Sequence, residues 1–178
     1  MRFGRALIFA WLGLYGCRAG GGGDSFDAMV RRLDTPDKLA AWINKRITFV
    51  SKFGAFSGPQ QIEETFRTKR GNCADVAMLV FHVLAAHRYE PHIMAIQVAS
   101  DVQKNHALCA FFQNGRLYSI NNGTLLGPYA GFEAIAADHH RNWSEYRVYD
   151  SLEAFSITHI PAVSKRRAGG VETNPAIP

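Results

Sequence analysis

The chain contains 178 residues, of which 47% are apolar and 20% are charged. This balance is typical of a single globular domain and excludes disorder of the whole chain. The formal net charge is +5, and without Arg2 and Arg5 of the N-terminal segment 18 basic and 15 acidic residues leave +3. A charge this small and this scattered does not indicate a nucleic-acid partner. Three cysteines are too few for a disulfide scaffold.

Residues 1–16 have the pattern of an export signal. Two arginines precede an apolar run over residues 6–15, which is too short to cross a bilayer as a mature helix. Residues 14–17 (LYGC) resemble the lipobox of bacterial lipoproteins, in which cleavage before the cysteine frees the residue that carries the lipid. The resemblance implies lipidation of Cys17 and an exported, membrane-anchored protein of the cell envelope. The alternative is an ordinary signal peptide in which Cys17 is incidental.

The two ends of the remaining chain are poor in core-forming residues. Glycines at positions 20–23 indicate a flexible tether over residues 17–26. Residues 161–178 contain three prolines and a basic triplet, and we expect them to form a disordered tail, in which the triplet is solvated or touches lipid headgroups. The working domain is therefore expected over residues 27–160.

The first half of this domain is expected to be mainly helical. Thr35 and Pro36 form a helix start, with a capping hydroxyl and then a proline at the first helical position. An apolar face with helical spacing follows and predicts a helix to about Lys45. Residues 47–50 favour a short strand, and residues 60–68 favour a helix.

Residues 74–87 are apolar almost all the way round, which predicts a helix that is buried on most of its sides. Runs rich in β-branched and aromatic residues then predict strands over residues 93–98, 107–112, 117–120 and 146–149. This order indicates an α+β fold, in which an antiparallel sheet packs on the central helix.

Asn114 and Gly115 predict a two-residue hairpin turn between two of these strands. This turn pairs residues whose numbers sum to 229, and it places His106, Leu108 and Asn121 on one face of the sheet, because faces alternate along a strand. Asn122 is expected to point away. The hairpin therefore brings an imidazole next to an amide.

Cys73 lies at the expected N-terminus of the buried helix, where free backbone N–H groups and the helix dipole favour a thiolate. Together with His106 and Asn121 it supplies a nucleophile, a proton carrier and a group that orients the imidazole. The backbone N–H of Cys73 is a candidate oxyanion donor. Gln60 or Gln61 is a candidate for the second donor, with Gln61 preferred, although a solvent-facing glutamine is the simpler interpretation.

Three segments carry a family resemblance: residues 70–77 (RGNCADVA), 105–107 (NHA) and 117–121 (LYSIN). They resemble the core of the transglutaminase-like cysteine proteases over about residues 35–127. The resemblance implies a papain-like/transglutaminase-like core with a Cys73-His106-Asn121 triad. The chain departs from the family pattern at Asn121, where aspartate is usual, and at Leu108, where tryptophan is frequent.

The function expected from the residues and the resemblance is thiol-dependent acyl transfer or hydrolysis at peptide, isopeptide or other amide bonds in the cell envelope. Hydrolysis of a peptide or protein substrate is favoured over cross-linking. The alternative is a catalytically silent, membrane-tethered module that binds peptide.

Two other roles for the cysteines and histidines compete with this interpretation. A Cys73–Cys109 disulfide is the main structural alternative, but Cys109 lies an odd number of residues from His106 and is expected on the other face of the sheet. Metal binding is disfavoured because the histidine spacings, including the adjacent His139 and His140 that should point apart, do not match a ligand set. We expect neither a metal nor another cofactor.

Overall fold

A six-stranded antiparallel sheet forms the centre of the computed structural model, which describes residues 25–50, 59–98, 105–156 and 163–166. The strand order is β6-β5-β4-β3-β7-β8. The bounds of these strands are β3 (Glu90–Gln97), β4 (His106–Gln113), β5 (Arg116–Asn121), β6 (Thr124–Tyr129), β7 (Glu145–Tyr149) and β8 (Val163–Arg166).

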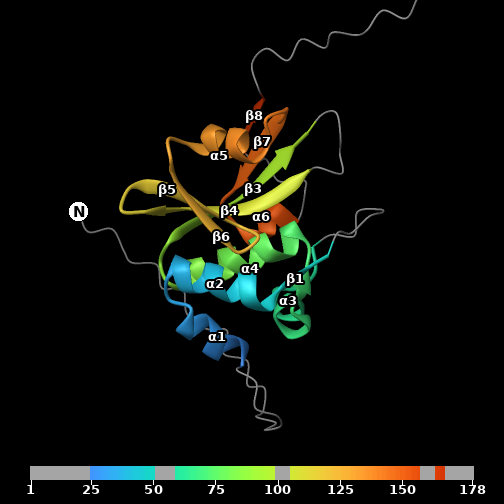
Figure 1. The fold of residues 1–178 in the computed structure, drawn as a ribbon, viewed down its shortest axis with the longest axis vertical. Coiled ribbons are helices and arrows are strands. Elements are labelled where there is room, and N and C mark those ends of the chain that lie inside the picture. The colour runs from blue at the N-terminus through green and yellow to red at the C-terminus, as the bar shows by residue number, and fades with distance from the viewer. Residues whose placement is uncertain (1–24, 51–58, 99–104, 157–162, 167–178) are drawn as a thin grey trace, which may run out of the picture.

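Helices cover both faces of this sheet (Figure 1). They are α1 (Phe26–Arg32), α2 (Pro36–Arg46), α3 (Ile62–Thr68), α4 (Cys73–Ala86), α5 (Phe132–His139) and α6 (Leu152–Ser156). Two further short strands, β1 (Thr48–Phe49) and β2 (Arg70–Gly71), pair in parallel and join the end of α2 to the start of α4. This α+β architecture confirms the fold class that the sequence predicts.

The buried central helix is α4. Its side chains Leu79, Val80 and Val83 are fully buried. They belong to one apolar cluster that also contains Ala107, Cys109 and Phe111 of β4. The Thr35 cap and the proline start of α2 are also as predicted, since the Thr35 hydroxyl accepts the backbone N–H of Lys38.

The opposite face of the sheet packs against α5. Met94, Leu108 and Ala110 of the sheet meet Ile135 of α5 and Trp143 in a second buried cluster. Successive residues of β4 therefore alternate between the α4 side and the α5 side, as strand geometry requires. The sequence predicts only the helical layer on the α4 side.

The Asn114-Gly115 hairpin has the predicted register. Both turn residues have positive φ, at 52° and 72°, and strand pairing runs from Gln113↔Arg116 to Cys109↔Ile120. Beyond Asn121 the chain differs from the prediction. Asn122 lies in a second tight turn that leads into β6, and no longer continues β5.

Three other features differ from those that the sequence predicts. Ser25 caps α1 with its side chain, so the end of the expected tether belongs to a helix. The expectation of a disordered tail from residue 161 is wrong for β8, whose backbone pairs with β7. Helices α5 and α6 and strand β6 were not predicted.

Residues 1–24, including Cys17, lie outside the described residues. Within the described ranges no helix has both the length and the apolar character that a bilayer crossing requires.

Candidate active site

Cys73 is the first residue of α4, and a reciprocal cap fixes it there. The Asn72 side-chain oxygen accepts the backbone N–H groups of Ala74 and Asp75, at 2.9 and 3.0 Å, and the Asp75 carboxylate accepts the backbone N–H of Asn72 at 2.8 Å. Gly71 is required before this turn, because a Cβ there would lie 2.9 Å from the Asp75 Cβ. The Gly-Asn-Cys segment therefore holds the thiol at a helix N-terminus.

The cap leaves the backbone N–H of Cys73 free to bind a substrate oxygen. Asn72 takes up the next two N–H groups, and the Cys73 N–H has no acceptor among the described residues. Gln60 donates its side-chain amide to Thr65 Oγ1 and to the Arg70 carbonyl, so it has structural partners. Gln61 is exposed at the start of α3, and its role as a second oxyanion donor stays a prediction.

His106 opens β4 and is hydrogen-bonded to Asn121 at the end of β5. The distance from His106 Nε2 to Asn121 Oδ1 is 2.7 Å. An amide oxygen only accepts, so Nε2 carries the hydrogen and Nδ1 of a neutral ring keeps its lone pair. Burial lowers the pKa of His106, and the hydrogen bond to Asn121 opposes this shift in part. The pairing of the two side chains is the one that the hairpin register predicts.

Two histidines at the end of α5 complete the surroundings of His106. Asn121 Nδ2 lies 3.1 Å from His139 Nδ1, and the rings of His139 and His140 lie 6.1 and 6.0 Å from the ring of His106. His139 is the last residue of α5 and His140 is the extended residue that follows it, and both rings border His106. The sequence contains no signal that α5 would reach His106.

Cys73 and His106 lie at the same end of the sheet. A short turn joins the end of α4 to the start of β3, so the helix and the strand run in opposite directions. The start of α4, with Cys73, therefore lies near the end of β3. That end pairs with the start of β4 at Ile96↔His106. His106 belongs, however, to the face that packs on α5, whereas Ala107 packs on the α4 side. No hydrogen bond joins Cys73 to His106, both of which lie in the described part of the chain.

Cys109 is a core residue. Both it and Cys73 are free thiols, so the disulfide alternative is wrong. Cys109 is fully buried in the apolar cluster around α4, and this burial raises its pKa far above the usual range. It lies on the α4 side of the sheet and His106 on the other, so the predicted separation of these two residues between opposite faces is confirmed.

The three remaining histidines in the described part of the chain have structural partners. His87 is hydrogen-bonded to the Val30 carbonyl, His92 contacts Asp150, and His82 packs on Phe26. In the described ranges no group of three or more histidine, cysteine, aspartate or glutamate side chains could hold a metal ion.

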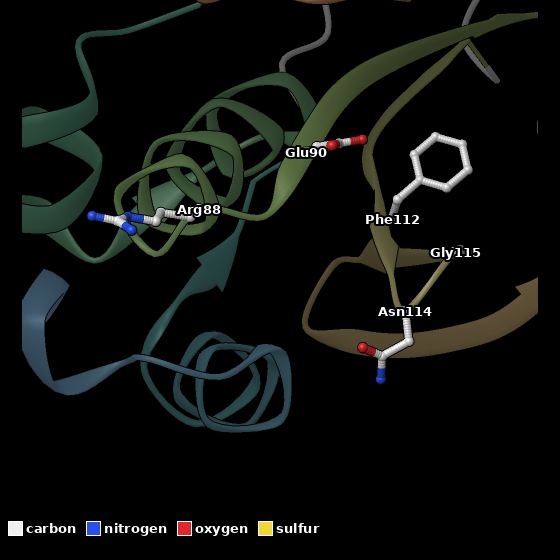
Figure 2. Close-up of a pocket in the computed structure, with 5 residues that line it drawn as sticks. All are labelled: Arg88, Glu90, Phe112, Asn114 and Gly115. Carbon is white, nitrogen blue, oxygen red and sulfur yellow. The ribbon is translucent and has the colours of Figure 1, made fainter.

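A small hollow lies at the opposite end of β4 from His106. It is lined by Arg88, Glu90, Phe112, Asn114 and Gly115. Figure 2 shows that these side chains point in different directions and do not converge. The hollow therefore offers no set of groups for catalysis.

Comparison with known proteins gives one family and several distant structures. A sequence model of the transglutaminase-like domain matches residues 30–149. Calcium-bound LapG from Legionella pneumophila is 12% identical, with a TM-score of 0.48, over 70% of this chain and 75% of LapG. A Cytophaga hutchinsonii protein provisionally described as a cysteine protease is 14% identical, with a TM-score of 0.41, over 77% of this chain and 49% of its own. No curated protein matches the chain.

Proposed function

Because the chain belongs to the transglutaminase-like domain family, we propose that it is a thiol-dependent enzyme that cleaves peptide, isopeptide or other amide bonds. The observation that carries the proposal is the hydrogen-bonded His106–Asn121 pair at the end of the sheet where α4 presents Cys73. These three residues supply the nucleophile, the proton carrier and the orienting amide that acyl transfer to sulfur needs.

In the proposed reaction Cys73 Sγ attacks the carbonyl carbon of the scissile bond, and His106 Nδ1 takes up the thiol proton. Hydrogen bonds between catalytic groups are often long without substrate and shorten when it binds, so Sγ and Nδ1 need to approach only in the complex. The tetrahedral intermediate collapses, the C–N bond breaks, and His106 returns the proton to the leaving amine. A thioester of Cys73 remains. Water then attacks its carbonyl carbon and gives a proton to His106, the C–S bond breaks, and the sulfur recovers that proton.

Charge on the carbonyl oxygen needs donors in the transition state. The backbone N–H of Cys73 is the first candidate, since the Asn72 cap leaves it without an acceptor among the described residues. Helix α4 adds the positive end of its dipole at this position. Gln61 remains the candidate for a second donor.

We further propose that water, and not an amine, resolves the thioester, and that the substrate is a peptide or protein of the cell envelope. The N-terminal sequence supports this location, since residues 1–17 have the pattern of a lipoprotein signal with Cys17 as the lipidated residue. No cofactor is needed for this reaction.

A catalytically silent module that binds peptide is the second candidate. One observation favours it: His106 and Asn121 belong to the sheet face that packs on α5, and no hydrogen bond joins His106 to Cys73 in the described part of the chain. Such a module would keep the fold and the surface around α4 but would have an ordinary thiol.

Acylation by p-nitrophenyl acetate distinguishes the two candidates. The enzyme should release a burst of p-nitrophenol that matches the concentration of protein, and mass spectrometry should find the acetyl group on Cys73. Cys73→Ala should abolish the burst, and Asn121→Ala should slow it about fivefold, since the loss of one orienting hydrogen bond is worth about 1 kcal/mol. Asn122→Gly is the matched control, because it changes the neighbouring exposed turn residue and should leave the burst unchanged. Acetylation of Cys73 at the rate of an unstructured peptide would favour the silent module.

A further inference from the structure

The side-chain nitrogen of Asn121, which faces away from His106, contacts a second histidine, His139. Asn121 Oδ1 binds His106 Nε2 at 2.7 Å, and Asn121 Nδ2 lies 3.1 Å from His139 Nδ1. The three side chains come from β4, β5 and α5, so one amide joins two imidazoles from separate elements. The family resemblance contains no residue at this fourth position.

The donors and acceptors along this chain have one consistent direction. The Asn121 amide nitrogen only donates, so His139 Nδ1 must accept, and the hydrogen of a neutral His139 lies on Nε2. The amide oxygen then points at His106, whose hydrogen must also lie on Nε2. His139 therefore determines which nitrogen of His106 keeps the lone pair, through the orientation of Asn121.

We propose that His139 is a positioning residue that fixes the amide of Asn121 and thereby keeps the Nδ1 lone pair of His106 available. The role of this lone pair as the base for Cys73 rests on the proposed function. The position of the hydrogen on His106 is independent of it and can be measured in a protein with no activity.

The surroundings of His139 favour its neutral ring, which is the state in which Nδ1 can accept a hydrogen bond from the amide. Burial lowers the pKa of His139, and the neighbouring His106 and His140 lower it further, while Asp138 raises it. His139 Nε2 is itself buried and has no hydrogen-bond partner among the described residues. The contact with Asn121 is therefore the polar contact that orients this ring.

A proton on His139 would reverse the arrangement. Nδ1 would then carry a hydrogen that faces the Asn121 amide nitrogen, so two donors would meet and the amide would turn over to present its oxygen to His139. Its nitrogen would face His106 Nε2, which would have to accept, and the hydrogen of His106 would move to Nδ1. His106 would then have no lone pair to offer to Cys73.

Two substitutions of His139 distinguish the loss of the hydrogen-bond acceptor from the loss of the ring itself. In His139→Asn an amide oxygen replaces Nδ1 on the same carbon, so the variant keeps an acceptor for Asn121 but does not titrate. His139→Leu keeps an apolar side chain without an acceptor. His92→Leu is the matched control, because His92 is also hydrogen-bonded through Nδ1 and its ring packs on Phe132 of the same helix.

The first readout is the tautomer of His106, measured from the 15N shifts of its ring nitrogens at pH 7.5 in the full chain. The wild type, His139→Asn and the His92→Leu control should all have the hydrogen on Nε2. His139→Leu should contain a mixture of both tautomers. The same tautomer in His139→Leu and the wild type would overturn the proposal, whether or not the protein has any activity.

The second readout is the rate at which iodoacetamide alkylates Cys73 between pH 5 and 8. His139→Leu should slow it about fivefold to tenfold at pH 7.5, as expected for one lost orienting hydrogen bond. His139→Asn should restore the rate and should lose less of it at low pH than the wild type does. A wild-type Cys73 of ordinary reactivity, with the tautomers as predicted, would contradict the proposed function and leave the role of His139 standing. Equal alkylation rates at pH 7.5 and equal losses of rate at low pH in the wild type, His139→Leu and His139→Asn would contradict the role of His139.

Discussion

The Asp75 carboxylate should be a main source of stability for the start of α4. Asp75 is fully buried and accepts the backbone N–H groups of Gln60 and Asn72, each at 2.8 Å. A hydrogen bond to a charged group contributes about 1.5–3 kcal/mol, so removing two of them in Asp75→Ala should lower the free energy of unfolding by about 3–6 kcal/mol. Because a domain is stable by only about 5–15 kcal/mol, this is a large fraction of the total.

Urea unfolding measures this loss as a fall in the midpoint with an unchanged slope. Asp75→Asn is the milder variant, since it keeps one oxygen acceptor but turns an amide nitrogen toward the second backbone N–H, and it should lose about half as much. Asp37→Ala is the matched control, because Asp37 is an exposed acid in the first turn of α2. Equal midpoints for Asp75→Asn and Asp37→Ala would refute the argument that the carboxylate holds this terminus.

Three further predictions concern the rest of the chain. Gly123 has φ +82°, and a Cβ there would lie 2.7 Å from the backbone nitrogen of Asn44. Gly123→Ala should therefore lower the free energy of unfolding by about 1–3 kcal/mol, which a lower Tm than that of the wild type would show. Burial lowers the pKa values of His106 and His139, so below pH of about 6.5 the unfolded chain binds more protons than the native protein and stability should fall as pH falls. A Tm that is constant from pH 7 to 5.5 would contradict this. Cys17→Ser should release the protein from membranes, and its retention in the membrane fraction would refute lipidation.

The parts of the fold that could be predicted are those with strong local signals. The apolar run of α4 indicates burial by composition alone, and the Asn114-Gly115 turn determines a register because a two-residue loop leaves no freedom in strand pairing. That register was sufficient to pair His106 with Asn121. A second Asn-Gly turn at residues 122–123 gives the same kind of signal for β6, but Gly127 and Pro128 weaken the strand pattern after it.

The parts that could not be predicted depend on packing between distant segments. Helix α5 is short, and Gly131, the residue before it, has no side chain to cap it, so little in the sequence marks this helix. Its position on the second face of the sheet brings His139 to Asn121, and spacing along the chain carries no information about that contact. Strand β8 is similar, because only its backbone pairing with β7 reveals it.

The most direct test of the account is iodoacetamide labelling of the full chain as a function of pH, with peptide mapping to separate Cys73 from Cys109. We expect Cys73 to react at and below pH 7 faster than the same cysteine in an unstructured peptide, and to lose this advantage in His106→Ala. Cys109 serves as the internal control, because its burial should leave it unreactive until the protein unfolds. A labelling profile of Cys73 that is the same in the wild type and in His106→Ala would contradict the central claim that the two residues act as a pair.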